Sequence, residues 1–366
     1  MKLTERKKMV LIHIAWILAL AVILWPLFTI AKYDYPSADD WSFGKYMYRA
    51  MQAGEGITGV FHAIYQTLAQ NVWEARFSIL ILSALQPAAF GEHFYRITPY
   101  LMIGSVILSQ FLLLRECIAG QAKENRWLIL PIGIPMAILQ VLYCPYPEES
   151  FYWYNGSVNY TFVYSLSLVL LIPFFWKAVR KMSYEFHFPG LFTALTFGVY
   201  ASQATATIYV DGTMGGGRQG AILWYFYVLW MVANVLYWCG WIAKRDAIAA
   251  KAEKADQLAG KYLLRYSTAA GVLLAAAVLF GNVQSTTSYR AYRMWKNGWA
   301  QAYGAGWEER LKVLKDDSVK NPVFTPLNYV ELIMYTDLQP EGGYVWVNSA
   351  CAEYYGKESV TVVEGE

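Results

Sequence analysis

Seven long apolar runs limit the fold of this chain more than any other feature of its sequence. Each run has few charged residues and is close to the roughly 20 residues that a helix needs to cross a bilayer core. The runs cover residues 9–30, 97–114, 127–144, 158–176, 190–210, 221–243 and 262–280. Only 16% of the 366 residues are charged, whereas about a quarter are charged in a soluble domain. The sequence therefore predicts an all-α polytopic membrane protein with about seven transmembrane helices.

The basic residues predict how these helices are oriented. Lys and Arg cluster before the first run and in three later loops, at 2–8, 115–126, 177–181 and 244–254. Since loops rich in Lys and Arg stay on the cytoplasmic side, we expect a cytoplasmic N-terminus and a retained signal anchor in the plasma membrane. All four clusters share one side only if the shorter apolar stretch 78–90, interrupted by Pro87, does not cross. We predict that this stretch is re-entrant or interfacial.

The opposite, extracytoplasmic side receives the other loops. We divide the chain into a transmembrane module, residues 1–282, and an extracytoplasmic C-terminal domain, residues 283–366. The first outer loop, 31–96, has apolar residues at helical spacing over 57–72, and this pattern predicts an interfacial helix.

The C-terminal domain is predicted to be a small α/β unit. Apolar residues recur every three or four positions over 292–314, which indicates an amphipathic helix. Short β-like runs at 323–324, 344–347 and 360–363 are separated by Pro and Gly, and they predict short strands.

Two adjacent carboxylates, Asp39 and Asp40, follow the first apolar run between Pro36 and Trp41. An ionised side chain at mid-bilayer costs roughly 2.5 kcal/mol or more, so the pair is expected at the water interface, within reach of a substrate. Pro, Ser and Asp also favour a turn or a helix start for local reasons. We keep both interpretations and favour a catalytic role, without deciding between the two carboxylates.

The loop at 145–160 has the composition of a carbohydrate site. Aromatic rings stack on the flat faces of sugars, and carboxylates and amides pair with hydroxyl groups. The candidate substrate-binding residues in this loop are Glu148, Glu149, Trp153, Asn155, Asn159 and Tyr160. An aromatic belt at the membrane interface is the alternative explanation for the rings.

Arginines on the predicted outer side are candidates for binding phosphate, because a guanidinium group can donate two parallel hydrogen bonds to one phosphate. The candidates are Arg76, with Glu74 nearby, and Arg290 and Arg293. A Gly-rich loop at 211–220 adds Arg218, although a flexible hairpin between spans also explains this loop. Ordinary contact with lipid headgroups explains any one of these arginines.

Cysteine and histidine spacing argues against a metal site. The four cysteines form no CxxC pattern, and no two of the four His residues stand at i and i+4. No basic tract with interleaved aromatic residues indicates a nucleic-acid partner. We therefore expect no metal ligands, no certain cofactor and no nucleic acid.

Three short motifs combine with this layout into a family resemblance. They are Ala38-Asp39-Asp40-Trp41, Ala75-Arg76-Phe77 and Trp153-Tyr154-Asn155-Gly156-Ser157-Val158-Asn159-Tyr160. The chain resembles the GT-C class of membrane glycosyltransferases, and more narrowly an uncharacterised bacterial family with Asp-Asp-aromatic, Gly-Arg-Phe and Trp-x-x-Gly-x-x-Asn-Tyr motifs. Tail segments at 345–348 and 352–356 are also similar to the closing domain of that family. Ala75 departs from the expected Gly, and an expected Asn-Glu pair is absent near 201–205.

The resemblance implies transfer of a sugar, with inversion, from a polyprenyl-phosphate donor in the bilayer to a glycan, lipid or protein acceptor of the cell envelope. Asp39 or Asp40 would be the general base, and Arg76 with the other outer arginines would stabilise the phosphate that leaves. The implied sugar contacts include Trp41, Trp153, Asn155 and Asn159. Some GT-C enzymes bind a divalent metal through a D-x-D pattern, and the contiguous Asp pair argues mildly against one here.

Two alternatives involve no chemistry. A flippase or transporter of lipid-linked glycans would need ionisable residues inside the spans, which contain few apart from His13 and Arg265. A catalytically inactive scaffold for envelope assembly is the other alternative, and the missing Asn-Glu pair favours it.

Overall fold

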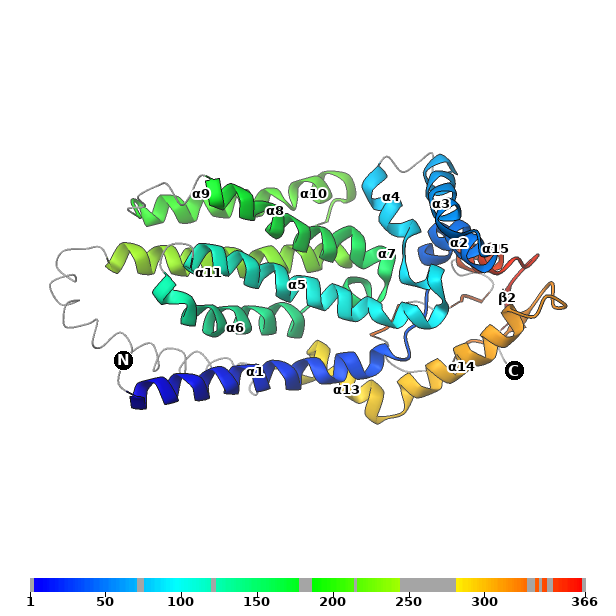
Figure 1. Cartoon of the computed structure of the whole chain (residues 1–366), viewed down its shortest axis with the longest axis horizontal. Coiled ribbons are helices and arrows are strands. Elements are labelled where there is room, and N and C mark those ends of the chain that lie inside the picture. Colours follow the sequence, from blue (N-terminus) through cyan, green and yellow to red (C-terminus); the bar gives the residue numbers. More distant parts are fainter. Residues whose placement is uncertain are drawn as a thin grey trace. The chain divides into compact units, whose positions relative to one another are not determined.

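The structure is a computed structural model. It describes residues 3–70, 76–119, 123–177, 186–213, 216–243, 281–327, 333–335, 338–340 and 345–363. Helices dominate this part of the chain, and the only strands in it are two of two residues each (Figure 1). The predicted all-α class is confirmed at this level.

Four helical segments of the described residues are long and apolar enough to cross a membrane, as expected of a membrane protein. They are Met9–Ala31, Glu92–Cys117, Tyr154–Pro173 and Arg218–Trp238. The main helices that overlap these segments are α1 (Leu3–Ala31), α5 (Thr98–Leu114), α8 (Val163–Lys177) and α11 (Arg218–Ala243). Each overlaps one of the seven predicted runs.

The other predicted runs form shorter helices or are not described. The run at 127–144 contains α6 (Ile129–Leu142), and the run at 190–210 is divided at residues 203–204 into α9 (Pro189–Ser202) and α10 (Thr205–Asp211). The run at 262–280 lies outside the described residues.

The stretch at 78–90 also forms only short helices. It holds the eight residues of α4 (Phe77–Ala84), followed by the 3₁₀ turn η1 (Pro87–Phe90). Eight residues of helix rise only about 12 Å, which is too little to cross a bilayer core of about 30 Å.

The chain divides into two compact units that are discontinuous in sequence. The bundle unit consists of Met1–Leu24, Ser105–Pro145 and Tyr164–Thr287, and the motif unit consists of Trp25–Gly104, Tyr146–Val163 and Ser288–Glu366. The motif unit thus groups the tail with the segments that carry Asp39 and Trp153. The predicted boundary between residues 282 and 283 stays a prediction.

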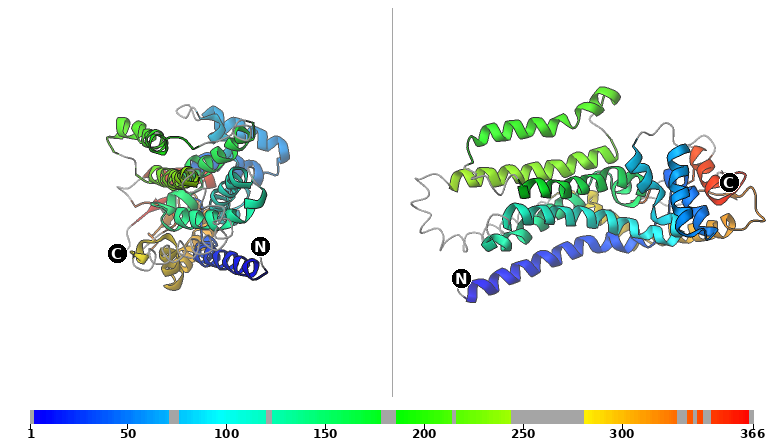
Figure 2. Two further views of the ribbon diagram at one scale, coloured as in Figure 1. Left: turned by 90° about the vertical axis from the view of Figure 1, so that its left-hand side faces the viewer. Right: turned by 45° about the horizontal axis from the view of Figure 1, so that its top comes forward.

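The bundle unit is held together mainly by apolar packing between helices. One cluster joins Trp16 of α1 to Ile134, Ile138 and Leu142 of α6. Helix α9 runs alongside α11 (Figures 1 and 2). Some polar groups inside the bundle find partners, since Gln140 Nε2 donates to the Tyr164 hydroxyl at 2.8 Å, while Gln140 Oε1 has no partner among the described residues. A buried amide without such a partner would cost about 1–3 kcal/mol.

Helix α2 (Asp39–Gln52) is the central element of the motif unit. Helices α3 (Gly56–Gln70) and α15 (Val345–Tyr355) both pack against it (Figure 1). Their packing buries Met47 and Ala50 of α2 with Ala63 of α3. The helix predicted over 57–72 is therefore confirmed over the described part of that range.

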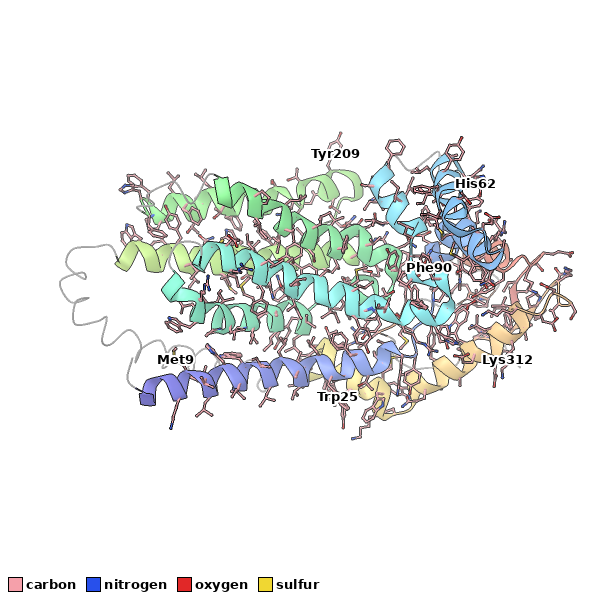
Figure 3. The ribbon with its side chains drawn as sticks, in the orientation of Figure 1. Met9, Trp25, His62, Phe90, Tyr209 and Lys312 are labelled. Carbon is pink, nitrogen blue, oxygen red and sulfur yellow. The ribbon has the colours of Figure 1, made fainter. Side chains whose placement is uncertain are left out.

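The two faces of α3 differ in an unusual way. Its fully buried residues are the small Gly59, Ala63 and Thr67, and Val60 and Ile64 are half-buried against the same core, while three other large side chains point outward. Ile57, Phe61 and Tyr65 are about 70% exposed, at 73%, 68% and 67%. Figure 3 shows the neighbouring His62 on the same helix pointing away from the ribbon. Such a contiguous apolar face is typical of a surface that contacts lipid or another protein.

The tail contains two helices where one was predicted. The range 292–314 spans α13 (Thr287–Lys296) and α14 (Trp299–Leu314), which are separated at Gly298, whose φ of 77° lies in the left-handed region. Strand β1 (Val323–Phe324) pairs in parallel with β2 (Thr361–Val362), as the β-like runs there predicted.

The strand predicted at 344–347 is wrong in its described part, because Val345 begins α15. Helix is favoured there since Val347, Cys351 and Tyr354, at helical spacing, bury one face of α15. This packing outweighs the β preference of the two valines.

Candidate functional site

The chain turns sharply just before α2. Ser37 and Ala38 form a turn in which the Asp40 N–H donates to the Ser37 carbonyl at 3.0 Å and the Trp41 N–H donates to the Ala38 carbonyl at 3.1 Å. Ala38 has a φ of 53°, which is uncommon for a residue other than glycine. The turn and helix start expected from local sequence therefore exist, and they hold the two carboxylates at the beginning of α2.

Asp40 is fully buried and receives four hydrogen bonds from three parts of the motif unit. Its Oδ2 accepts from the Ser37 N–H at 3.1 Å and from the Tyr95 hydroxyl at 2.5 Å. Its Oδ1 accepts from the backbone N–H of Asn155 at 3.0 Å and from Asn155 Nδ2 at 2.7 Å. We call these residues the Asp40 network. Through Asn155 and Asp40, which are 115 residues apart in sequence, the Asp40 network directly links the two motifs at 38–41 and 153–160.

Burial and hydrogen bonding act on Asp40 in opposite directions. Burial disfavours the charged form and raises the pKa of the carboxyl to about 7, while the hydrogen bonds from Tyr95, Ser37 and Asn155 favour the charged form and limit the rise. The group therefore titrates near neutral pH. Each of the two carboxylate oxygens of Asp40 already accepts two hydrogen bonds. In this arrangement Asp40 therefore orients its neighbours and does not contact a substrate.

Asp34 is a second buried carboxylate that the sequence did not single out. It is 1% exposed, and its Oδ2 has no hydrogen-bond partner among the described residues. Burial raises the pKa of Asp34 well above the usual range, and the nearby charge of Asp40 raises it further. A hydrogen bond from the Tyr35 backbone N–H and, to a smaller extent, the charge of Arg96 oppose this rise. Two like charges at such a site cannot both ionise easily, so Asp34 holds a proton when Asp40 is charged.

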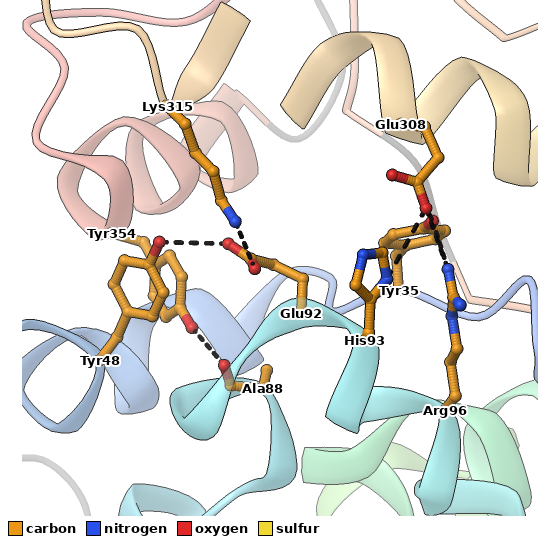
Figure 4. Close-up of polar contacts among 9 residues, drawn as sticks. All are labelled: Tyr35, Tyr48, Ala88, Glu92, His93, Arg96, Glu308, Lys315 and Tyr354. Carbon is orange, nitrogen blue, oxygen red and sulfur yellow. Dashed lines mark hydrogen bonds and ion pairs between the residues drawn. The ribbon is translucent and has the colours of Figure 1, made fainter. Parts of the chain in front are cut away.

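A second polar cluster lies around Tyr35 (Figure 4). The Tyr35 hydroxyl donates to Glu308 of α14, and Arg96 donates to the Tyr35 hydroxyl at 2.8 Å and to Glu308 Oε1 at 3.0 Å. These contacts hold the pKa of Glu308 below its usual range. Their effect is to fix α14 against the turn that leads into α2. The sequence did not predict this cluster.

Asp39 and Trp41 flank Asp40 in different environments. Asp39 is partly exposed at the first position of α2, so it is the carboxylate of the pair that can meet solvent. Trp41 is fully buried, and its ring lies 5.8 Å from that of Trp307. Trp41 is thus part of the core of the motif unit.

The loop at 145–160 brings its predicted residues to the Asp40 network. Trp153 Nε1 donates to the Ser37 carbonyl at 3.2 Å, and the Trp153 ring stacks on Tyr335 with centroids 4.0 Å apart. Asn159 Nδ2 donates to the Asn155 carbonyl at 2.7 Å. The side-chain oxygens of Asn155 and Asn159 are buried without a partner among the described residues, so they remain able to accept hydrogen bonds.

The remaining predicted residues are more scattered. Burial raises the pKa of Glu148, and the charge of Arg290 opposes this rise. Glu149 and Tyr160 are half-buried in the same loop. Arg76 is exposed immediately before α4, and the Arg293 guanidinium lies 5.7 Å from the Trp299 ring centroid.

Two candidates fall outside this site. Glu74 lies outside the described residues, and Arg218 belongs to the bundle unit. In the part of the chain that the structure describes, no group of three or more His, Cys, Asp or Glu side chains is arranged to hold a metal ion.

Comparison of the chain with family models, with curated proteins and with solved structures found no match. The function must therefore be argued from the site itself.

Proposed function

We propose that the protein is a membrane glycosyltransferase that takes a sugar from a polyprenyl-phosphate donor and transfers it, with inversion, to a cell-envelope acceptor. The observation that carries the proposal is the pair of hydrogen bonds from Asn155 to Asp40. These hydrogen bonds join the acidic motif at 38–41 to the aromatic and amide motif at 153–160. The sequence predicts that the first motif supplies the base and the second binds the sugar of the same substrate.

The two carboxylates have different roles in this proposal. Asp39, which is partly exposed, takes the proton of the acceptor hydroxyl. The acceptor oxygen then attacks the anomeric carbon of the donor sugar, and the bond from that carbon to the phosphate oxygen breaks. Asp40 is a positioning residue, which holds Asn155 and the start of α2 in register.

Binding of the donor is assigned to the polar groups around this pair. The free side-chain oxygens of Asn155 and Asn159 accept hydrogen bonds from sugar hydroxyls. Arg76 and Arg290 stabilise the charge that develops on the phosphate as it leaves. The apolar face of α3 lies on the membrane surface, where a lipid-linked donor is dissolved.

Seven spans, a cytoplasmic N-terminus and an extracytoplasmic motif unit belong to the same proposal. The four candidate spans and the one-sided basic loops support them. With this orientation the plasma membrane supplies the donor, and the acceptor approaches from outside.

The first prediction tests the base. Cells that make only Asp39→Asn should lose the glycan that cells with the intact chain make, because an amide cannot take the hydroxyl proton; general-base catalysis contributes about 10²–10⁴-fold in rate. The measurement is mass-spectrometric profiling of envelope glycans and lipids, with protein level checked by immunoblot. Glu309→Gln removes an exposed carboxylate of the same unit and should leave the profile unchanged. A normal profile with Asp39→Asn would show that Asp39 is not the base.

An inactive scaffold for envelope assembly is the second candidate, and one observation favours it. All four acceptor positions of Asp40 are filled by protein donors, as in a structural carboxylate. A scaffold predicts that removing the chain changes the glycan profile while Asp39→Asn does not. The same experiment therefore separates the two candidates.

A further inference from the structure

A cleft of about 540 Å³ opens in the motif unit where three helices end. Helix α2 ends at Gln52, α14 at Leu314 and α15 at Tyr355, and all three residues line the cleft. Pockets that bind small ligands commonly have volumes of about 300–1,000 Å³. None of the residues predicted from sequence for the transfer site lines this cleft, so it is a separate feature.

Aromatic rings form the floor of the cleft. Tyr48 and Tyr354 stack with their centroids 4.2 Å apart, and Tyr355 meets Tyr354 edge-on at 5.0 Å. Figure 4 shows how the first two rings are fixed: the Tyr48 hydroxyl donates to Glu92 Oε1 at 3.1 Å, and the Tyr354 hydroxyl donates to the Ala88 carbonyl at 3.0 Å. Both side chains are almost fully buried, so the cleft has a rigid aromatic wall.

Tyr355 differs from the other two tyrosines. Its ring is partly exposed, yet its hydroxyl is buried and has no hydrogen-bond partner in the described residues. A buried hydroxyl without a partner costs about as much as a lost hydrogen bond. A ligand hydroxyl in the cleft would satisfy it.

Polar side chains surround the floor. Arg49 donates to the Glu353 carbonyl and makes no ion pair with a carboxylate among the described residues. Lys315 pairs with Glu92 at 2.8 Å, and Gln52 and Asp317 are exposed. The rim therefore offers several donors and a carboxylate acceptor.

The side-chain charges of the cleft cancel, and the three helix ends leave it slightly negative. Arg49 and Lys315 contribute two positive charges, and Asp317 and Glu92 two negative ones. The helix ends add roughly half a negative charge each, because the last carbonyls of a helix carry its negative pole. A site for phosphate would need an excess of positive charge. This mixture of donors, acceptors and ring surface fits a neutral ligand rich in hydroxyl groups.

We propose that this cleft binds a neutral oligosaccharide. A sugar ring offers a C–H face to the partly exposed Tyr355, and the sugar hydroxyls pair with Arg49, Gln52, Asp317 and the Tyr355 hydroxyl. Binding of the saccharide does not depend on the transfer reaction.

One consequence does rest on the proposed function. Asp39 and Gln52 stand at opposite ends of α2, about 20 Å apart along its axis at 1.5 Å per residue. An acceptor that occupies both places must be a chain of several sugars. The acceptor is therefore a growing glycan, and the cleft holds the part that has already been made.

Binding is tested with the full chain purified in detergent. A panel of immobilised neutral gluco-, manno-, galacto- and chito-oligosaccharides is compared with oligogalacturonate, and the strongest neutral probe is then titrated by calorimetry. We expect neutral probes to bind with little dependence on salt, since salt screens charge interactions and not neutral contacts. Binding of no neutral probe, or of oligogalacturonate alone, would overturn the proposal.

Variants of the rim locate the binding. The affinity for the best neutral probe should fall in each of three variants, Arg49→Gln, Gln52→Ala and Tyr355→Phe. The loss should be largest, about tenfold, for Arg49→Gln, because hydrogen bonds from a charged donor are the strongest of the set. Lys312→Gln removes a charge on the exposed side of α14 (Figure 3) and should leave binding unchanged. Gln52 is exposed, so its variant should fold even if the others do not. Unchanged binding in Gln52→Ala and Tyr355→Phe would contradict the assignment.

Failure of this proposal and failure of the transfer proposal give different results. Asp39→Asn should keep full saccharide binding and lose transfer. Arg49→Gln should lower transfer to long acceptors and leave transfer to short ones unchanged. Sugar transfer without saccharide binding in the cleft would contradict the cleft proposal and leave the transfer proposal standing. Saccharide binding without sugar transfer would contradict the transfer proposal and leave the cleft proposal standing.

Discussion

Two carboxyl groups that influence each other electrostatically are buried in the motif unit, but they differ in the donors around them. Asp40 accepts four hydrogen bonds, whereas Oδ2 of Asp34 has no partner among the described residues. Burial alone would make both costly to ionise. The donors decide which of them carries the charge, and this difference can be measured with amide variants.

Asp40→Asn should lower the free energy of unfolding of the motif unit by about 1–3 kcal/mol, because the new NH₂ group must face two donors in either orientation. Asp34→Asn should be neutral or stabilising at pH 8, since it removes a buried group whose charge is disfavoured. Thermal unfolding of the purified chain, followed by tryptophan fluorescence, compares the two. Equal destabilisation by both variants would contradict the role given to the donors.

Stability should also depend on pH in a defined direction. The folded-state pKa of Asp40 is raised from its ordinary 3.8 to about 7, so the folded protein binds more protons than the unfolded chain over that range. The stabilising contribution of Asp40 is then greatest below pH 4. It falls by up to about 4 kcal/mol as pH rises to about 7 and is constant above that. Unfolding of Asp34→Asn and Asp40→Asn over the same pH range should show weaker slopes than the intact chain.

The sequence predicted Asp39, Asp40 and Asn155 as members of one site, but it gave no sign of Asp34 or of the Tyr95 hydroxyl. The motif residues stand out because of their neighbours in the chain. Asp34 differs from an exposed aspartate only through residues that fold around it from distant segments, and no local pattern records that. The same limit applies to Trp41, which was expected at the substrate and is in the core.

At the scale of elements, α2 is tightly constrained along one side. A Cβ added at Gly44 would lie 2.3 Å from Gln86 Nε2 and 3.3 Å from the Tyr354 ring. Gln86 in turn donates to the Asp40 carbonyl. The glycine therefore allows α15 and the segment around Gln86 to approach the same turn of α2.

Gly44→Ala should destabilise the protein by about 1–3 kcal/mol through this overpacking, although alanine has the higher helix propensity. Gly104→Ala is the matched control, because nothing lies within 4 Å of the added Cβ in α5. The control should be neutral or slightly stabilising. Thermal unfolding of both variants checks the prediction, and a stabilised Gly44→Ala would show that the contact relaxes freely.

Local sequence predicted some elements well and others poorly. The helix over 57–72 was predicted from its regular apolar spacing. The strands at 323–324 and 360–363 were predicted from short β-like runs bounded by Pro and Gly. Helix α15 was missed because its first residues prefer strands, and its buried face appears only over the whole element. Gly298 divides the predicted tail helix because glycine readily adopts the left-handed conformation that ends a helix.

For the whole molecule, the apolar side of α3 and the candidate spans predict a definite arrangement in the bilayer. Lys312→Cys should react with a membrane-impermeant maleimide added outside intact cells, and Lys7→Cys should react only after the membrane is opened, each measured above the wild-type background. Both side chains are exposed in their own units. Labelling in the reverse order would contradict the proposed orientation. It would place the motif unit on the cytoplasmic side, away from an extracytoplasmic acceptor.

The Asp40 network also has a consequence for synthesis. Its donors reach the carboxylate from Ser37, from Tyr95 and finally from Asn155, 115 residues after Asp40. A ribosome adding about 5–20 residues per second needs about 6–23 s to make that length. During this interval the Asp40 carboxylate of the nascent chain lacks the two hydrogen bonds from Asn155. The arrival of the 145–160 loop therefore sets the earliest moment at which the Asp40 network can form, and the motif unit closes only after the tail with α14 and α15 has been made.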